Sequence, residues 1–220
     1  MSWTSFWSVL PFSSDWMRWN LFLALLPLGF SFGLFRLARE RSLLWWVGVL
    51  VFIAFLPNAP YTVTDIIHMV EEIKYTESLL VNTLVILPKY ILFLLLGFGA
   101  YVLSLINLER YLKTQDLSQW ILPAELALHG LSAVGVALGR LNRFNSWDLI
   151  TQPQQVIFGV IQNLVEGRSL LFIAVSTLLI ACLYWITKQI VLGLSLRYQS
   201  LSSEASKMGK DQKSASNIGA

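Results

Sequence analysis

The chain has 220 residues, of which 55% are hydrophobic and only 13% are charged, and its formal net charge is +3. A soluble domain normally carries about 25% charged residues, so this composition indicates a membrane protein rather than a large soluble domain. The basic residues are scattered and form no stripe with interleaved aromatic residues, so we expect no nucleic-acid partner.

Long apolar runs predict five membrane-spanning helices, because a helix needs about 20 apolar residues to cross the hydrocarbon core of a bilayer. In chain order, the predicted spans lie near residues 20–35, 43–56, 82–106, 120–139 and 169–187. The first run has no basic region before it and no convincing cleavage site, so we interpret it as a retained signal anchor. The second run is short for a complete span.

The segments outside the spans predict short interfacial helices and a polar tail. Residues 66–78 and 149–165 have the amphipathic character of helices that lie at a membrane surface or insert partly into it. Residues 199–220 are rich in Ser, Lys and Gly and are expected to be disordered. The predicted fold is therefore all-α: one polytopic transmembrane helical bundle over residues 1–198, with the lipid bilayer as its surroundings.

The distribution of Lys and Arg near the span ends predicts the orientation. Residues 36–42, residues 107–118 and the tail after Lys188 together carry nine basic residues, whereas the segments on the opposite face carry five. Since cytoplasmic loops are enriched in basic residues, we expect the N-terminus outside and the C-terminus in the cytoplasm.

Two polar motifs follow the ends of apolar runs. They are FLPNAPYTVTDIIH at 55–68 and LGRLNRFNSWD at 138–148. With five spans, both emerge on the outer side, where residues 57–68 and 140–148 are predicted to form one polar site. The candidate ligand-binding residues of this site are Asn58, Asp65, His68, Arg140, Arg143, Asn145 and Asp148.

The spacing of the polar residues leaves two interpretations of their role open. Asp65, His68 and Glu72 share one helix face and are candidate ligands of a divalent metal, with a further ligand from the second motif. Alternatively, a carboxylate pairs with Arg140 or Arg143 in a structural network, because bidentate bonds between arginine and a carboxylate are strong. No cofactor is predicted.

The fourth predicted span contains unusual residues for a membrane helix. Glu125 and His129 lie one turn apart and are expected to face the bundle, either as a proton relay or coupling-ion site or as a pair that holds helices together. Gly135 and Gly139 form a G-x-x-x-G pattern that predicts close packing against another span. Cys182, in the fifth run, is expected to be a small buried apolar residue.

The two motifs, in this order and spacing, resemble the uncharacterised bacterial membrane-protein family known as domain of unknown function 1361. The resemblance covers most of residues 43–190 and excludes the tail at 199–220. It implies a multi-span protein of the bacterial inner membrane and implies no activity.

Three functional hypotheses remain open. The leading one is a non-enzymatic, transport-related or accessory subunit whose outward site binds a ligand or a membrane-protein partner. The second is a membrane-embedded enzyme, metal-dependent or not, that uses Asp65, His68 and Asp148 on a lipid-linked or periplasmic substrate. The third is a structural assembly factor, in which the polar motifs only hold the bundle together.

Overall fold

The computed structural model describes residues 15–38 and 40–218. These residues contain helices and no strand, which confirms the predicted all-α fold. In chain order, the helices are α2 (Asp15–Phe32), η1 (Gly33–Leu37), α3 (Leu43–Phe55), α4 (Asn58–Thr64), α5 (Ile66–Tyr75), α6 (Leu79–Val81), η2 (Asn82–Ile86), α7 (Leu87–Thr114), η3 (Ser118–Trp120), α8 (Ile121–Leu141), α9 (Asp148–Thr151), α10 (Pro153–Val165) and α11 (Gly167–Ile218).

Within these ranges, five helical stretches are long and apolar enough to cross a membrane, which confirms the predicted number. They are Asp15–Leu37, Leu43–Tyr75, Leu79–Thr114, Ser118–Leu141 and Gly167–Ser200. The second is longer than the predicted 43–56, because α4 and α5 follow α3 with only short turns between them. Pro57, with a φ of −60°, ends α3 and immediately precedes α4, since a proline is tolerated where a helix begins.

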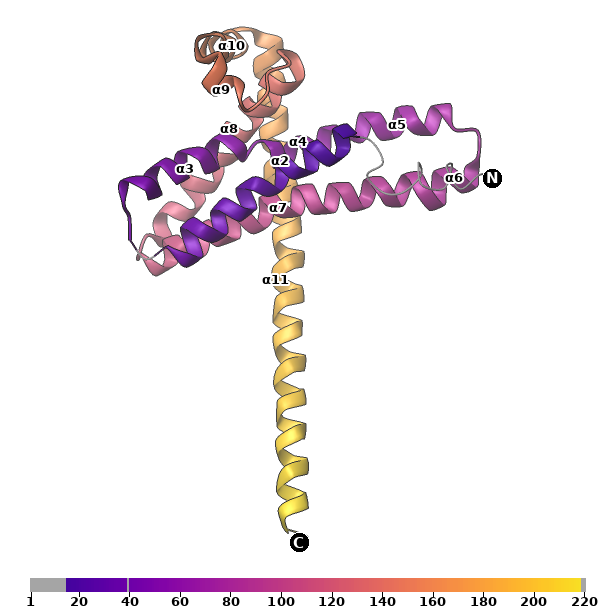
Figure 1. Cartoon of the computed structure of the whole chain (residues 1–220), viewed down its shortest axis with the longest axis vertical. Helices are drawn as coiled ribbons and strands as arrows, with labels where there is room; N and C mark the ends of the chain where they lie inside the picture. Colours follow the sequence, from indigo (N-terminus) through magenta and orange to yellow (C-terminus); the bar gives the residue numbers. More distant parts are fainter. Residues whose placement is uncertain (1–14, 39, 219–220) are drawn as a thin grey trace. The chain divides into compact units, whose positions relative to one another are not determined.

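The first four spans form one bundle, in which α7, the main helix of the third span, contacts α2, α4 and α8. α2 contacts α7, α3 and α4, and α4 also contacts α7 and α8 (Figure 1). The aromatic side chains of Phe52, Tyr90, Phe93 and Tyr101 are buried between these helices. This packing places α4, which carries the first motif, between α2, α7 and α8.

Glycines allow α4 to approach its neighbours closely. A Cβ atom on Gly135 of α8 would lie 2.5 Å from the Cβ atom of Pro57, and one on Gly139 would lie 2.8 Å from Cε2 of Tyr61. Both distances are shorter than real contacts allow. The G-x-x-x-G pattern therefore serves packing inside the chain, as expected from the sequence.

Two basic loops share one end of the bundle. Arg36 Nε donates a hydrogen bond of 2.7 Å to Oδ1 of Asn107, and Arg41 Nε donates one of 2.7 Å to the hydroxyl of Tyr111. These bonds join residues that precede α3 to the last turns of α7. The residues around 36–42 and 107–111 therefore lie at the same end of the bundle; which membrane face this end occupies stays a prediction.

The predicted interfacial segments are helical. Residues 66–75 form α5, which contacts η2 and α7, and residues 149–165 fall in α9 and α10, of which α10 contacts α8. Their location at a membrane surface stays a prediction.

The chain divides into two compact units after Cys182. Cys182 itself is exposed, so the expectation that it is buried is wrong. An apolar side chain on a membrane-spanning helix can face lipid as readily as protein, which explains the error. In the second unit, α11 continues to Ile218. The single domain over 1–198 and the disordered tail at 199–220 stay predictions.

Candidate functional site

The first motif folds as a short helix that ends in a turn. Asp65, with φ −73° and ψ −2°, separates α4 from α5. Thr62 Oγ1 donates a hydrogen bond of 2.7 Å to the carbonyl of Ala59, and Thr64 Oγ1 donates one of 2.6 Å to the carbonyl of Tyr61. These bonds pair the threonine hydroxyl protons within α4. The oxygen of Thr64 can still accept a hydrogen bond from another helix.

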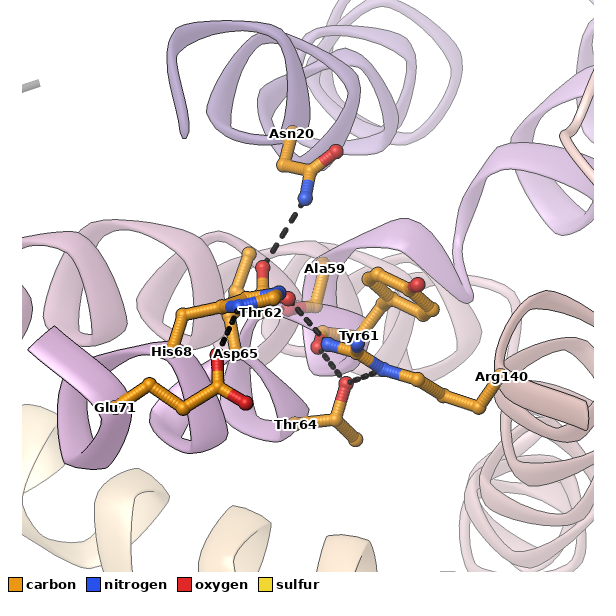
Figure 2. A network of polar contacts seen from close by, with 9 residues as sticks. All are labelled: Asn20, Ala59, Tyr61, Thr62, Thr64, Asp65, His68, Glu71 and Arg140. Carbon is orange, nitrogen blue, oxygen red and sulfur yellow. Dashed lines mark hydrogen bonds and ion pairs between the residues drawn. The ribbon is translucent and has the colours of Figure 1, made fainter. Parts of the chain in front are cut away.

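Asp65 is the centre of a buried polar network (Figure 2). Its side chain is 1% exposed and forms an ion pair with the guanidinium of Arg140. Asn20 of α2 donates a hydrogen bond of 3.1 Å to the other carboxylate oxygen, and Arg140 Nε donates one of 2.7 Å to Oγ1 of Thr64. The guanidinium carbon also lies 4.4 Å from the centre of the Tyr61 ring. Three helices are joined at this carboxylate, which neutralises Arg140.

The second motif leaves α8 through a turn. Arg143 has a φ of 61°, which few residues other than glycine adopt, so the chain changes direction there. Asp148 then fixes the turn: its Oδ2 accepts a hydrogen bond of 2.7 Å from the backbone N–H of Asn145, and its Oδ1 accepts one of 3.3 Å from the hydroxyl of Thr151. The Asp148 carboxylate therefore joins the turn before α9 to the last residue of that helix.

The two motifs are in direct contact through Asn58 and Ser146. The Asn58 amide donates a hydrogen bond of 2.8 Å to the Ser146 hydroxyl oxygen, and that hydroxyl donates one of 3.1 Å to Oδ1 of Asn58. The same amide also donates a hydrogen bond of 2.8 Å to the carbonyl of Phe55, the last residue of α3. Residues 57–68 and 140–148 therefore contact each other, through Asn58 and Ser146 and through Asp65 and Arg140.

A cavity of about 480 Å³ lies where the motifs meet. Its lining residues come from α2, α3, α4, α8, the turn after α8, and α9 and α10. They are Trp19, Asn20, Leu23, Ile53, Ala54, Pro57, Asn58, Tyr61, Leu131, Val134, Gly135, Leu138, Gly139, Arg143, Phe144, Asn145, Ser146, Leu149 and Val156. A volume of this size falls within the range of ligand-binding pockets, about 300–1,000 Å³.

Arg143 gives the cavity its only charge among these lining residues. Its side chain is exposed and takes part in no hydrogen bond or ion pair within the described part of the chain. The side-chain amide of Asn145, next to it in the lining, likewise has no partner among the described residues. The cavity therefore presents an unneutralised guanidinium and a free amide.

The three candidate metal ligands have separate partners. Asp65 pairs with Arg140, His68 Nδ1 lies 3.5 Å from Oε2 of Glu71, and Glu72 accepts two hydrogen bonds, of 2.6 and 2.8 Å, from the amino group of Lys89. Across the described ranges, no group of three His, Cys, Asp or Glu side chains is arranged to hold a metal ion. The geometry therefore gives no support to a metal site here, and His68 does not line the cavity.

Glu125 and His129 do not line the cavity either. His129 is buried, and its Nδ1 lies 2.7 Å from the hydroxyl of Tyr101 on α7. This contact joins α8 to α7 inside the bundle. Whether the pair carries protons or only holds helices together stays a prediction.

Several residues of the site were not among the predicted candidates. Asn20 and Trp19 come from the beginning of the first span, Asn20 lies 45 residues before Asp65, and no local pattern marks either residue. Tyr61 and Ser146 stand inside the two motifs but were not among the candidates. A signal for Tyr61 was present: an aromatic residue near arginines is a common partner of a guanidinium.

Comparisons with known proteins place the chain in a family. Searches of curated proteins and of solved structures found no match. A family model described as a protein of unknown function, DUF1361, matches residues 19–183. This range covers both motifs and every lining residue of the cavity. Because the match extends over well more than half of the chain, the protein belongs to the DUF1361 family.

Proposed function

We propose that this protein is a non-enzymatic, transport-related or accessory membrane protein that binds a ligand in the cavity between its two motifs. The supporting observation is that Arg143, which has no partner in the described part of the chain, lines a cavity of about 480 Å³. The helical architecture and the family fit an integral membrane protein of unknown activity. Ligand binding in the cavity is the part that we propose.

A purely structural role accounts for only part of the polar groups. It explains the buried pair of Asp65 and Arg140, in which each charge has a partner. It assigns no role to Arg143, an exposed guanidinium that lines the cavity and has no partner among the described residues. Ligand binding explains both: the pair holds the helices in place, and the second arginine faces the ligand.

The geometry does not favour the enzymatic alternative over binding. Asp65 is engaged by Arg140 and Asn20, and Asp148 caps the turn of the second motif. His68, the third residue of that hypothesis, lies against Glu71 and the Trp16 ring. With these groups occupied elsewhere, no nucleophile with an adjacent base lines the cavity.

We further propose that the cavity faces the outer side of the bacterial inner membrane. The support is the excess of Lys and Arg in residues 36–42, residues 107–118 and the tail after Lys188, three segments that the sequence assigns to one membrane face. Arg36 and Arg41 of the first segment contact the last turns of α7. The exposed Cys182 is first replaced by alanine, and single cysteines are then introduced by Asn145→Cys and Glu40→Cys. A membrane-impermeant maleimide should label intact cells through Asn145→Cys, and through Glu40→Cys only after permeabilisation. The reverse pattern would refute the orientation.

Ligand binding is tested by filling the cavity. Val134 lines it, whereas Leu122 on the same helix is exposed and does not. Native mass spectrometry of protein released from a mild detergent should show a retained small molecule on the wild type and on Leu122→Trp. Val134→Trp should retain at least tenfold less. Equal retention by the two tryptophan variants, or none by the wild type, would refute binding in the cavity.

A further inference from the structure

Building on the proposed function, we infer that the ligand is an amphiphile with an anionic phosphate headgroup and an apolar chain. The cavity has two chemically different parts. One part is polar and includes Asn58, Arg143, Asn145 and Ser146. The other part is apolar and is lined by Leu23, Ile53, Ala54, Leu131, Val134, Leu138 and Val156.

The polar part carries a positive charge that none of the described residues balances. Among them, Arg143 has no ion-pair partner, no Asp or Glu lines the cavity, and the neighbouring Arg140 is already neutralised by Asp65. An anionic group would supply the missing counter-charge. The planar fork of a guanidinium matches two oxygens of a carboxylate or of a phosphate. A phosphate has a third strong acceptor oxygen, which the side-chain amide of Asn145 can satisfy, so we infer a phosphate.

The apolar part reaches into the depth of the membrane. Leu131 lies ten residues before the end of α8 at Leu141, which corresponds to about 15 Å along a helix. This is about half of a hydrocarbon core of roughly 30 Å. The lining therefore extends from Arg143, just beyond the end of the span, toward the middle of the bilayer, which matches a headgroup at the interface and a chain within one leaflet.

The apolar part is also open to the side. Leu131 is 52% exposed although it lies in the middle of a span, so the cavity is not sealed there by the described residues. Trp19, a second lining residue, is exposed as well and stacks at 6.1 Å from the ring of Trp147. An apolar chain could enter from the lipid without passing through water, whereas a soluble anion would leave the apolar lining unused.

The experiment compares three probes that separate the headgroup from the chain. Full-length protein in an uncharged detergent is titrated with dioleoyl phosphatidate, with dioleoylglycerol, which has the same chains without phosphate, and with glycerol 3-phosphate, which has the phosphate without chains. Native mass spectrometry gives the bound fraction of each. Phosphatidate should bind at least tenfold more tightly than either of the other two.

Arg143 is then varied against a matched control. Arg143→Gln should weaken phosphatidate binding about tenfold or more, as expected for the loss of a charge-assisted bond. Arg143→Asn should do the same, and it keeps a residue that tolerates the positive φ. Arg168→Gln, an exposed arginine outside the lining, should leave binding unchanged. Thermal unfolding of each variant establishes that it is folded.

Each contrary result rejects a stated part of the inference. Equal binding of dioleoylglycerol would reject the phosphate headgroup, and equal binding of glycerol 3-phosphate would reject the apolar chain. Equal effects of Arg143→Gln and Arg168→Gln would reject the role of Arg143. If no probe binds, the amphiphile is rejected, while retention by the wild type and loss in Val134→Trp would still support a ligand of another class.

Discussion

Replacing one member of the pair formed by Asp65 and Arg140 should destabilise the protein by an amount that depends on which member is removed. Arg140→Gln leaves the Asp65 carboxylate, 1% exposed, with only the amide of Asn20 as a charge-stabilising partner. Asp65→Asn leaves a guanidinium whose side chain is 21% exposed, hydrogen-bonded to Thr64 and close to the ring of Tyr61. The two ends of one ion pair therefore differ in how well they tolerate its loss.

The magnitudes follow from that difference. Breaking a buried ion pair costs about 3–5 kcal/mol when an uncompensated charge stays buried, and we expect this for Arg140→Gln. Asp65→Asn should cost about 1–3 kcal/mol, because the remaining guanidinium keeps a hydrogen bond, an aromatic contact and some water. The double variant should cost less than the sum of the two, since neither charge is left behind.

Unfolding in mixed micelles with increasing fractions of a denaturing detergent, followed by tryptophan fluorescence, measures these free energies. The control is the ion pair of Asp15 and Arg18, whose side chains are 93% and 61% exposed. Asp15→Asn should change the stability by less than about 1 kcal/mol, as is usual for exposed pairs. If Arg140→Gln costs no more than Asp15→Asn, or if the double variant is strictly additive, the reasoning about this buried pair is refuted.

Two further predictions concern the contacts around α4. In the same unfolding assay, Gly135→Ala should destabilise the protein by about 1–3 kcal/mol, because its Cβ would lie 2.5 Å from the ring of Pro57. Gly130→Ala is the control: it has open space around its Cβ and should be neutral or stabilising by up to about 1 kcal/mol. Ser146→Ala should cost about 1–3 kcal/mol, and Asn58→Ala should cost more, because it removes the same two hydrogen bonds and also the bond to the Phe55 carbonyl. The two costs should not add in the double variant; strict additivity in a double-mutant cycle would contradict this contact.

Much of the fold could be predicted from the sequence, because the bilayer sets the length of a span and apolar runs reveal it. The second span was the exception. The apolar run ends at Leu56 and is short for a complete span, yet helices continue through α4 and α5 to Tyr75. Proline is unfavourable inside a helix but acceptable at its start, so the same residue ends α3 and opens α4.

From the sequence, the two motifs could be selected as a candidate site, but not which of their residues pair with each other and which line a cavity. The polar residues around Asp65 and Arg140 stand out against apolar runs, and their pairing was one of the two interpretations considered. Which of the other polar residues face a cavity depends on α2, whose Asn20 lies 45 residues from Asp65 in the chain. Such contacts between distant segments follow from helix packing, which a single sequence does not reveal.

The two arginines of the second motif illustrate the same limit. Arg140 belongs to the last turn of α8, one residue after Gly139, whose missing side chain lets Tyr61 approach, and its guanidinium lies over that ring. Arg143 comes after the helix has ended, in a backbone conformation with φ of 61°, and its side chain lines the cavity. Three residues of spacing thus separate an arginine that stabilises the bundle from one that has no counter-charge among the described residues. In the sequence both are equivalent basic residues beside a span; the end of α8 between them is what pairs Arg140 with Asp65 and leaves Arg143 at the cavity.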